Sequence, residues 1–168
     1  MSKTIKAITL WQPWASLVAV GAKKIETRSW GTKYRGPLAI HAAKLWNQEL
    51  ESYLSSWEFQ TGLAPLVGKP LDLLKYTWSG VEAEQLPRGV IVAICNLTDC
   101  IPTDNLTLEQ IGTDFPFGNW ARGRFAWMLA DVRPLTTPIS AKGKQGLWEW
   151  EVPETRGWSD ADQDRMGD

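Results

Sequence analysis

The feature that most constrains the fold of this chain is an almost unbroken apolar run, GVIVAICNL, at residues 89–97. A short apolar run of this kind predicts a strand at the centre of a sheet, buried on both faces. The strand is expected to continue towards Cys100. A central strand needs a neighbouring strand on each side, so the chain must supply further strands.

Five further segments have strand character and two have helical character. Residues 24–30 and 146–152 alternate with a period of two, as expected for strands with one buried face. The expected strands, in order, are residues 4–10, 24–30, 37–43, 89–97, 123–135 with a break before Pro134, and 146–152. The expected helices are residues 14–20, between Pro13 and Gly21, and residues 45–59, with one more turn at 107–111. This order predicts an α+β domain: a small mixed, mostly antiparallel β-barrel of five or six strands with short flanking helices.

One domain accounts for most of the chain. A chain of 168 residues, 43% of them hydrophobic, buries a sufficient core without disulfides or metals. We expect the domain to span residues 1–152, with a partly irregular excursion at about 60–88 that is rich in glycine and proline and holds a short helix near 71–76. Residues 153–168 are polar and acidic, and are expected to form a disordered, dispensable tail.

Few residues are available for metal or redox chemistry. Cys95 and Cys100 are too few for a cysteine-based zinc site or a disulfide framework and are interpreted as core thiols. No apolar stretch approaches the roughly 20 residues that a membrane span needs. Motifs of phosphate-binding loops, dinucleotide-binding folds, serine hydrolases and zinc proteases are also missing from the sequence. We therefore expect a cytoplasmic monomer with no metal, cofactor or membrane contact.

The net charge of −1 hides an uneven distribution along the chain. Residues 1–44 carry a charge of +7, residues 45–152 carry −5, and residues 153–168 carry −3. The basic first quarter is interleaved with aromatic side chains (Trp11, Trp14, Trp30 and Tyr34). That mixture is typical of a surface for phosphates and stacked bases. The alternative is an ordinary solvated face whose charge is balanced by acidic neighbours in the fold.

A charged strand follows the first helix and carries a recognisable pattern. Gly21, Lys23, Glu26 and Arg28 fit the pattern GxKxxExR, and QPWA precedes it at residues 12–15. Ser29-Trp30, Tyr34-Arg35-Gly36 and Ile40-His41-Ala42 follow it. Together these segments resemble the ASCH domain family, a group within the PUA-like superfamily of small β-barrels that takes its name from a transcription coactivator. The resemblance covers most of residues 5–152, apart from the excursion.

The resemblance implies a PUA-like barrel with a cleft that handles RNA, DNA or a modified nucleoside. On a strand, Glu26 and Arg28 share a face, so a carboxylate that accepts from a base lies beside a guanidinium that holds a phosphate. Lys23 would add a compact charge, and Trp14 or Trp30 a stacking wall. The alternative is that these charges only pair with one another at the rim of the barrel. The candidate binding residues are Gln12, Trp14, Lys23, Glu26, Arg28, Trp30, Arg35, His41 and Lys44.

Two other functions are compatible with the same residues. Some ASCH-like proteins are amidohydrolases of N4-acylated cytidine and others are ribonucleases; if this chain is an enzyme, Lys23 and Glu26 are the candidate catalytic residues. The threonine of the amidohydrolase pattern is replaced here by Glu26, and its distant glutamate has no match beyond Glu109. A third possibility is a protein-interaction adaptor that uses exposed tryptophans as anchors. His41 is a general base, a ligand contact or, as we expect, a packed, hydrogen-bonded core residue.

Overall fold

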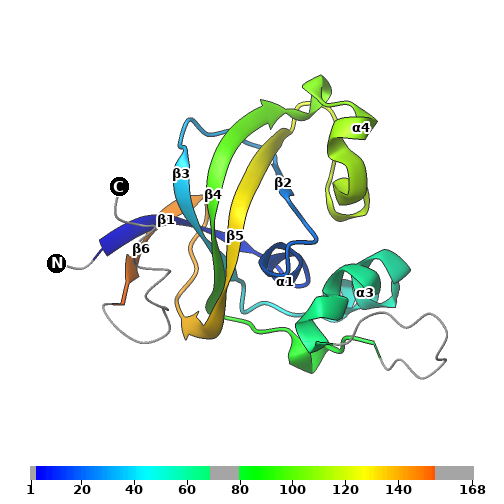
Figure 1. Ribbon diagram of the computed structural model, residues 1–168, viewed down its shortest axis with the longest axis vertical. Coiled ribbons are helices and arrows are strands. Elements are labelled where there is room, and N and C mark those ends of the chain that lie inside the picture. Colours follow the sequence, from blue (N-terminus) through cyan, green and yellow to red (C-terminus); the bar gives the residue numbers. More distant parts are fainter. Residues whose placement is uncertain (1–2, 69–79, 154–168) are drawn as a thin grey trace.

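The computed structural model describes residues 3–68 and 80–153 of the chain (Figure 1). Six strands form one sheet in the order β2-β5-β4-β3-β1-β6. The strands are β1 (Lys3–Leu10), β2 (Ile25–Arg28), β3 (Gly36–Ala42), β4 (Val90–Pro102), β5 (Phe125–Ser140) and β6 (Leu147–Val152). The helix expected near 71–76, and the tail beyond Pro153, lie outside the described residues.

The sheet is mixed and mostly antiparallel, as the sequence predicts. Only β1 and β3 run parallel among the strand pairs of the described chain, whereas β1–β6, β3–β4, β4–β5 and β2–β5 are antiparallel. The two end strands, β2 and β6, are not hydrogen-bonded to each other within the described residues. The sheet is thus open in its hydrogen bonding, and its fold is compatible with a barrel. The α+β class is confirmed.

The two longest strands, β4 and β5, carry the curvature of the sheet (Figure 1). Their pairing shifts register at three places, and Asp131 in β5 adopts a φ of 52°. Irregularities of this kind bend and twist a strand pair. The prediction that the strand breaks before Pro134 is wrong, since β5 continues to Ser140. Within the described residues β2 pairs only with Phe125–Met128, so the later part of β5 has one unpaired edge there, where a proline is tolerated.

The first helix, α1 (Trp14–Ala19), packs against β3, β4 and β5 and belongs to the main core. Trp127 of β5 is fully buried in that core. A second buried cluster lies under β6, where Trp148, Trp150 and Val152 alternate with exposed residues. The alternation predicted for the closing strand is therefore confirmed, and the strand pairs with β1.

The prediction of a single helix over residues 45–59 is wrong. The structure has α2 (Gln48–Ser52), a 3₁₀ turn at Tyr53–Ser55, and α3 (Trp57–Leu63). Asn47 caps α2 through its side-chain oxygen, and Ser56 breaks the helix with extended backbone angles. Serine and asparagine side chains compete for backbone groups, which favours helix ends over helix interiors.

Both described ends of the 60–88 excursion are packed. The side-chain amide of Gln60 donates through Nε2 to Val81 O at 3.0 Å and accepts through Oε1 from Val81 N at 2.7 Å. Leu63, Val81 and Leu86 are buried together in a third cluster. A last short helix, α4 (Leu108–Ile111), lies where a helical turn is expected.

Candidate functional site

A cleft of about 1610 Å³ is built by segments that lie far apart in the sequence. Its walls come from the start of α1, from β2, from the end of β3, from residues 116–119 and from the β5–β6 loop at residues 140–146. The cleft therefore joins the charged strand predicted from the sequence to two segments from the second half of the chain.

The turn between α1 and β2 sets the direction of the charged strand. Gly21 follows the helix with a φ of 79°, a left-handed conformation that favours glycine. In β2, Ile25 and Thr27 are buried, while Glu26 and Arg28 are partly exposed and line the cleft. The predicted alternation is correct, and it places the carboxylate and the guanidinium on one face.

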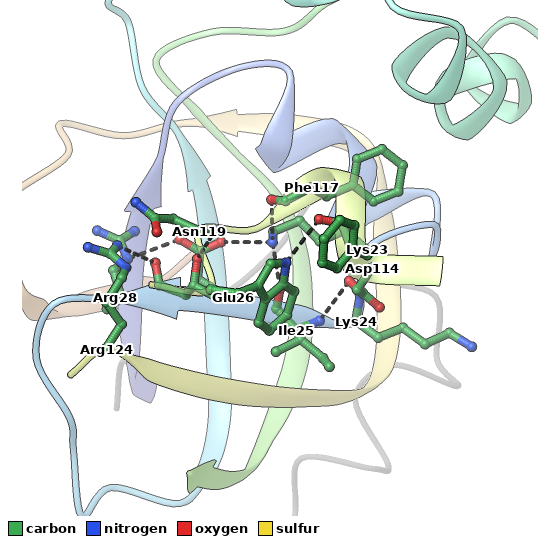
Figure 2. Close-up of polar contacts among 12 residues, drawn as sticks. Lys23, Lys24, Ile25, Glu26, Arg28, Asp114, Phe117, Asn119 and Arg124 are labelled. Atoms are coloured by element: carbon green, nitrogen blue, oxygen red, sulfur yellow. Dashed lines mark hydrogen bonds and ion pairs between the residues drawn. The ribbon is translucent and has the colours of Figure 1, made fainter. Parts of the chain in front are cut away.

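Lys23 lies beneath this face rather than in the cleft. Its side chain is fully buried, and its ammonium donates to Ile25 O and, at 3.0 Å, to Phe117 O (Figure 2). The same nitrogen lies 3.4 Å from Glu26 Oε2. Lys23 was expected to offer its charge to a ligand, but here that charge holds the end of the 3₁₀ segment Gly112–Phe117 against β2.

Asp114 holds the same segment from its other side. Its Oδ1 accepts from Lys24 N at 2.7 Å and from Ile25 N at 3.1 Å, at the start of β2. Burial raises the pKa of this carboxyl, and the two backbone hydrogen bonds act in the opposite direction. The sequence carries no local signal for this role, because the partners are ninety residues away.

Glu26 lies between charges of the opposite sign. Figure 2 shows Arg28 and Arg124 on one side of the carboxylate and Lys23 on the other. Arg28 Nε lies 3.0 Å from Glu26 Oε1, and Arg28 Nη2 donates to Thr9 O at 2.7 Å. Arg124 Nη2 donates to Thr27 O at 3.3 Å. Arg124 was not predicted from the sequence; it enters the site because the neighbouring Phe125 pairs with Arg28 across β5 and β2.

The other predicted residues divide into two groups. Trp14, Trp30, His41 and Lys44 line the cleft together with Glu26 and Arg28, whereas Gln12, Lys23 and Arg35 do not. The buried amide of Gln12 bonds to Ser16 and to Pro87 O, so it fixes the start of α1. Arg35 pairs with Asp99 at 2.8 Å on the surface.

Aromatic side chains from several segments line the cleft. The side chain of Trp11 is 55% exposed and that of Tyr53 is 37% exposed, both unusually open for their size. Trp14 contacts Tyr53 edge to face, with ring centroids 4.7 Å apart. Trp30 is held in the same geometry against buried Trp127. Trp11 and Tyr53 therefore offer open ring surface beside rings that packing holds in place.

The charge of the cleft is strongly positive, although the chain is slightly acidic. Five cationic side chains line it against the single carboxylate of Glu26: Arg28, Lys44, Arg124, Lys142 and Lys144. Only Arg28 and Lys44 come from the basic first quarter, so that segment supplies less of the positive surface than expected. Arg28 pairs with Glu26, and none of the remaining four, Lys44, Arg124, Lys142 and Lys144, forms an ion pair with an acid of the described chain.

His41 is packed at the edge of the cleft. Its Nε2 lies 3.0 Å from Ala141 O, and its Nδ1 is buried without a hydrogen-bond partner among the described residues. A Cβ at Gly143 would come within 2.4 Å of the imidazole ring, so only glycine fits there. Burial lowers the pKa of His41.

Nothing in the described residues forms a group of metal-ligating side chains. Burial raises the pKa of the Cys95 thiol to about 12, which makes it a poor nucleophile. Among residues 3–68 and 80–153, no helix has the length and apolar character to cross a membrane.

The fold and the cleft define a small α+β domain with a basic cleft lined by aromatic side chains. The chain belongs to the ASCH domain family, whose model matches residues 8–139, so the resemblance seen in the sequence is confirmed. It is similar to activating signal cointegrator 1 of Homo sapiens, with 27% identity over 145 residues, and of Mus musculus, with 26% over 143 residues. These alignments cover 84% of this chain but only 22% of each relative. A solved structure of ASCH from Zymomonas mobilis aligns with a TM-score of 0.49 and 12% identity, over 96% of this chain and 92% of that one.

Proposed function

We propose that the cleft binds nucleic acid, either RNA or DNA. The observation that carries the proposal is that five cationic side chains and the exposed rings of Trp11 and Tyr53 line the same cleft. Lysine and arginine side chains neutralise phosphates, which supplies affinity that does not depend on the base sequence. Exposed aromatic rings stack on bases, and this favours unpaired bases over a duplex.

The positions of the cations support a path for the phosphate backbone along the β5–β6 loop. Lys142 and Lys144 are exposed on this loop. Lys44 lies close to this loop in the fold. Gly89 packs against the side chain of Lys44, and the carbonyl of Gly89 accepts a hydrogen bond from Ala141 N in the loop. Three exposed lysines from two neighbouring segments therefore line the cleft.

The contacts of Lys23 favour binding over hydrolysis. A catalytic lysine must reach the substrate with a free amine or a transferable proton. The Lys23 ammonium instead donates to two backbone carbonyls and does not line the cleft. The amidohydrolase of N4-acylated cytidine and the ribonuclease are therefore less well supported than a binding module.

The test is the affinity of the full chain for labelled single-stranded and duplex oligonucleotides over a range of salt concentrations. Affinity should fall steeply with salt, and the single strand should bind more tightly. The double variant Lys142→Ala/Lys144→Ala should lower the slope of log K against log salt by roughly 1.4 to 1.8, because each lost phosphate contact removes about 0.7 to 0.9.

A matched control removes the same charge outside the cleft. Lys24 and Lys33 are exposed and do not line the cleft, so Lys24→Ala/Lys33→Ala should leave the slope close to that of the unaltered protein. Equal slopes for both double variants, or no measurable binding by the unaltered protein, would contradict the proposal. In the second case a protein-interaction adaptor becomes the better explanation.

A further inference from the structure

The carboxylate of Glu26 is held by ion pairs with its neighbours, yet it accepts no well-aligned hydrogen bond from the described residues. Its side chain is 13% exposed, with ion-pair distances of 3.0 Å to Arg28 and 3.4 Å to Lys23. The Lys23 ammonium directs its hydrogen bonds to Ile25 O and Phe117 O, and Arg28 Nε is buried without a hydrogen-bond partner. No described residue donates a well-aligned hydrogen bond to Glu26. Each oxygen therefore keeps lone pairs that can accept from a ligand in the cleft while the ion pairs hold the carboxylate in place.

Hydrogen-bond donors surround this pair of acceptors. Asn119 lines the cleft with Glu26, and its backbone N–H donates to Thr27 Oγ1 at 2.9 Å (Figure 2). Its Oδ1 accepts from Ala121 N at 3.1 Å, which leaves the amide nitrogen to donate. The Nε–H groups of Arg28 and Arg124 are also buried without acceptors among the described residues. A ligand that fits must present adjacent donors to Glu26 and an acceptor beside them.

Among the unmodified bases, guanine has that arrangement on its Watson–Crick edge. Its N1–H and N2–H donors are adjacent, and O6 follows as an acceptor. Adenine and cytosine place a ring acceptor next to their amino group, so one carboxylate oxygen would face a lone pair. Uracil and thymine have one N–H between two carbonyls. A carboxylate therefore binds guanine with both oxygens and any other standard base with one.

We propose that Glu26 makes the cleft selective for an unpaired guanine, with Glu26 accepting from N1–H and N2–H and with Asn119 or an arginine donating to O6. The proposal rests on the proposed function, since the base must first be delivered by a bound nucleic acid. Lys23 and Arg28 act as positioning residues that hold the carboxylate. Base pairing hides this edge in a duplex, so the guanine must be unpaired.

The experiment compares single-stranded oligothymidylates of one length that carry one central guanine, inosine, adenine or cytosine. Guanine should bind about 5- to 100-fold more tightly than adenine or cytosine, the range for a two-bond base contact. Inosine lacks the N2 amino group, so its affinity should fall between those of guanine and adenine. This comparison uses the unaltered protein and does not depend on whether a variant folds.

Two variants assign the preference to Glu26. Glu26→Gln has only one acceptor and turns an N–H towards the base, so the preference for guanine should disappear while binding of the cytosine strand persists. Lys142→Ala should weaken binding of all four strands by a similar factor and keep their order.

The outcomes separate this inference from the proposed function. Salt-dependent binding with equal affinity for the four strands would overturn guanine selectivity and leave the nucleic-acid proposal intact. Equal affinity for guanine and inosine would overturn the contact of both donors with Glu26. If none of the strands binds, both proposals are wrong.

Discussion

Lys23 provides a sharp test of the structure, because a fully buried lysine is rare unless it is paired. Replacing it with methionine keeps much of the length of the side chain and removes the ammonium. Ile25 O and Phe117 O then lose their donor, and Glu26 keeps only Arg28 as a close cation.

The size of the effect follows from these contacts. A buried acceptor left without its donor costs about 1 to 3 kcal/mol, and removing one partner of a buried charged pair costs about 3 to 5 kcal/mol. The apolar methionine recovers part of this by burying its own side chain. We expect Lys23→Met to lower the free energy of unfolding by about 3 to 5 kcal/mol. For a domain of this size that corresponds to a fall in Tm of roughly 6 to 20 °C.

The assay is urea unfolding followed by circular dichroism, with Lys24→Met as the matched control. Lys24 is the next residue and is exposed, and its hydrogen bond to Asp114 comes from the backbone N–H, which methionine retains. The control should change the free energy of unfolding by less than about 0.5 kcal/mol. If Lys23→Met is as stable as Lys24→Met, the Lys23 ammonium is not buried as described, and the structural role assigned to it is wrong.

The remaining predictions concern the cleft and its edge. Trp11→Ala should weaken the binding of a single-stranded oligonucleotide by about 5- to 100-fold, the cost of one lost stack, measured by isothermal titration calorimetry. Trp57→Ala removes a side chain of equal exposure, 55%, outside the cleft and should not weaken binding. Equal losses of affinity in Trp11→Ala and Trp57→Ala would contradict base stacking on Trp11. His41 is the only histidine, so its imidazole NMR signals should give a pKa below the usual 6.5. Because the folded-state pKa is lowered, the free energy of unfolding should decrease as the pH falls from about 6.5 towards that pKa, and His41→Gln should remove this dependence. A pKa at or above 6.5 would show that burial does not dominate the titration of this ring.

Elements set by local sequence were predicted well. The α1–β2 unit depends on Pro13, on the left-handed Gly21 and on period-two alternation, all of which are visible in the residues themselves. The apolar run in β4 likewise reflects burial on both faces of that strand. The alternation in β6 reflects burial on one face only. The helix at 45–59 failed because helical spacing continues across Ser56, where the backbone leaves the helix.

The candidate site was predicted only in part, because its chemistry depends on distant segments. Glu26 and Arg28 follow from alternation along one strand. The burial of Lys23 depends on Phe117, ninety-four residues later, and no local pattern shows that contact. Arg124 and the lysines of the β5–β6 loop enter the cleft through sheet pairing, which a single sequence does not specify.

The most direct test of nucleic-acid binding in the cleft is an NMR titration of the tryptophan indole N–H signals with a single-stranded oligonucleotide. Trp11, Trp14 and Trp30 line the cleft, whereas Trp57 and Trp150 do not, so the chain carries its own internal controls. We predict that the first three signals shift in a saturable, salt-sensitive way while the signals of Trp57 and Trp150 stay in place. Saturable shifts at Trp57 with none at the cleft tryptophans would contradict the account.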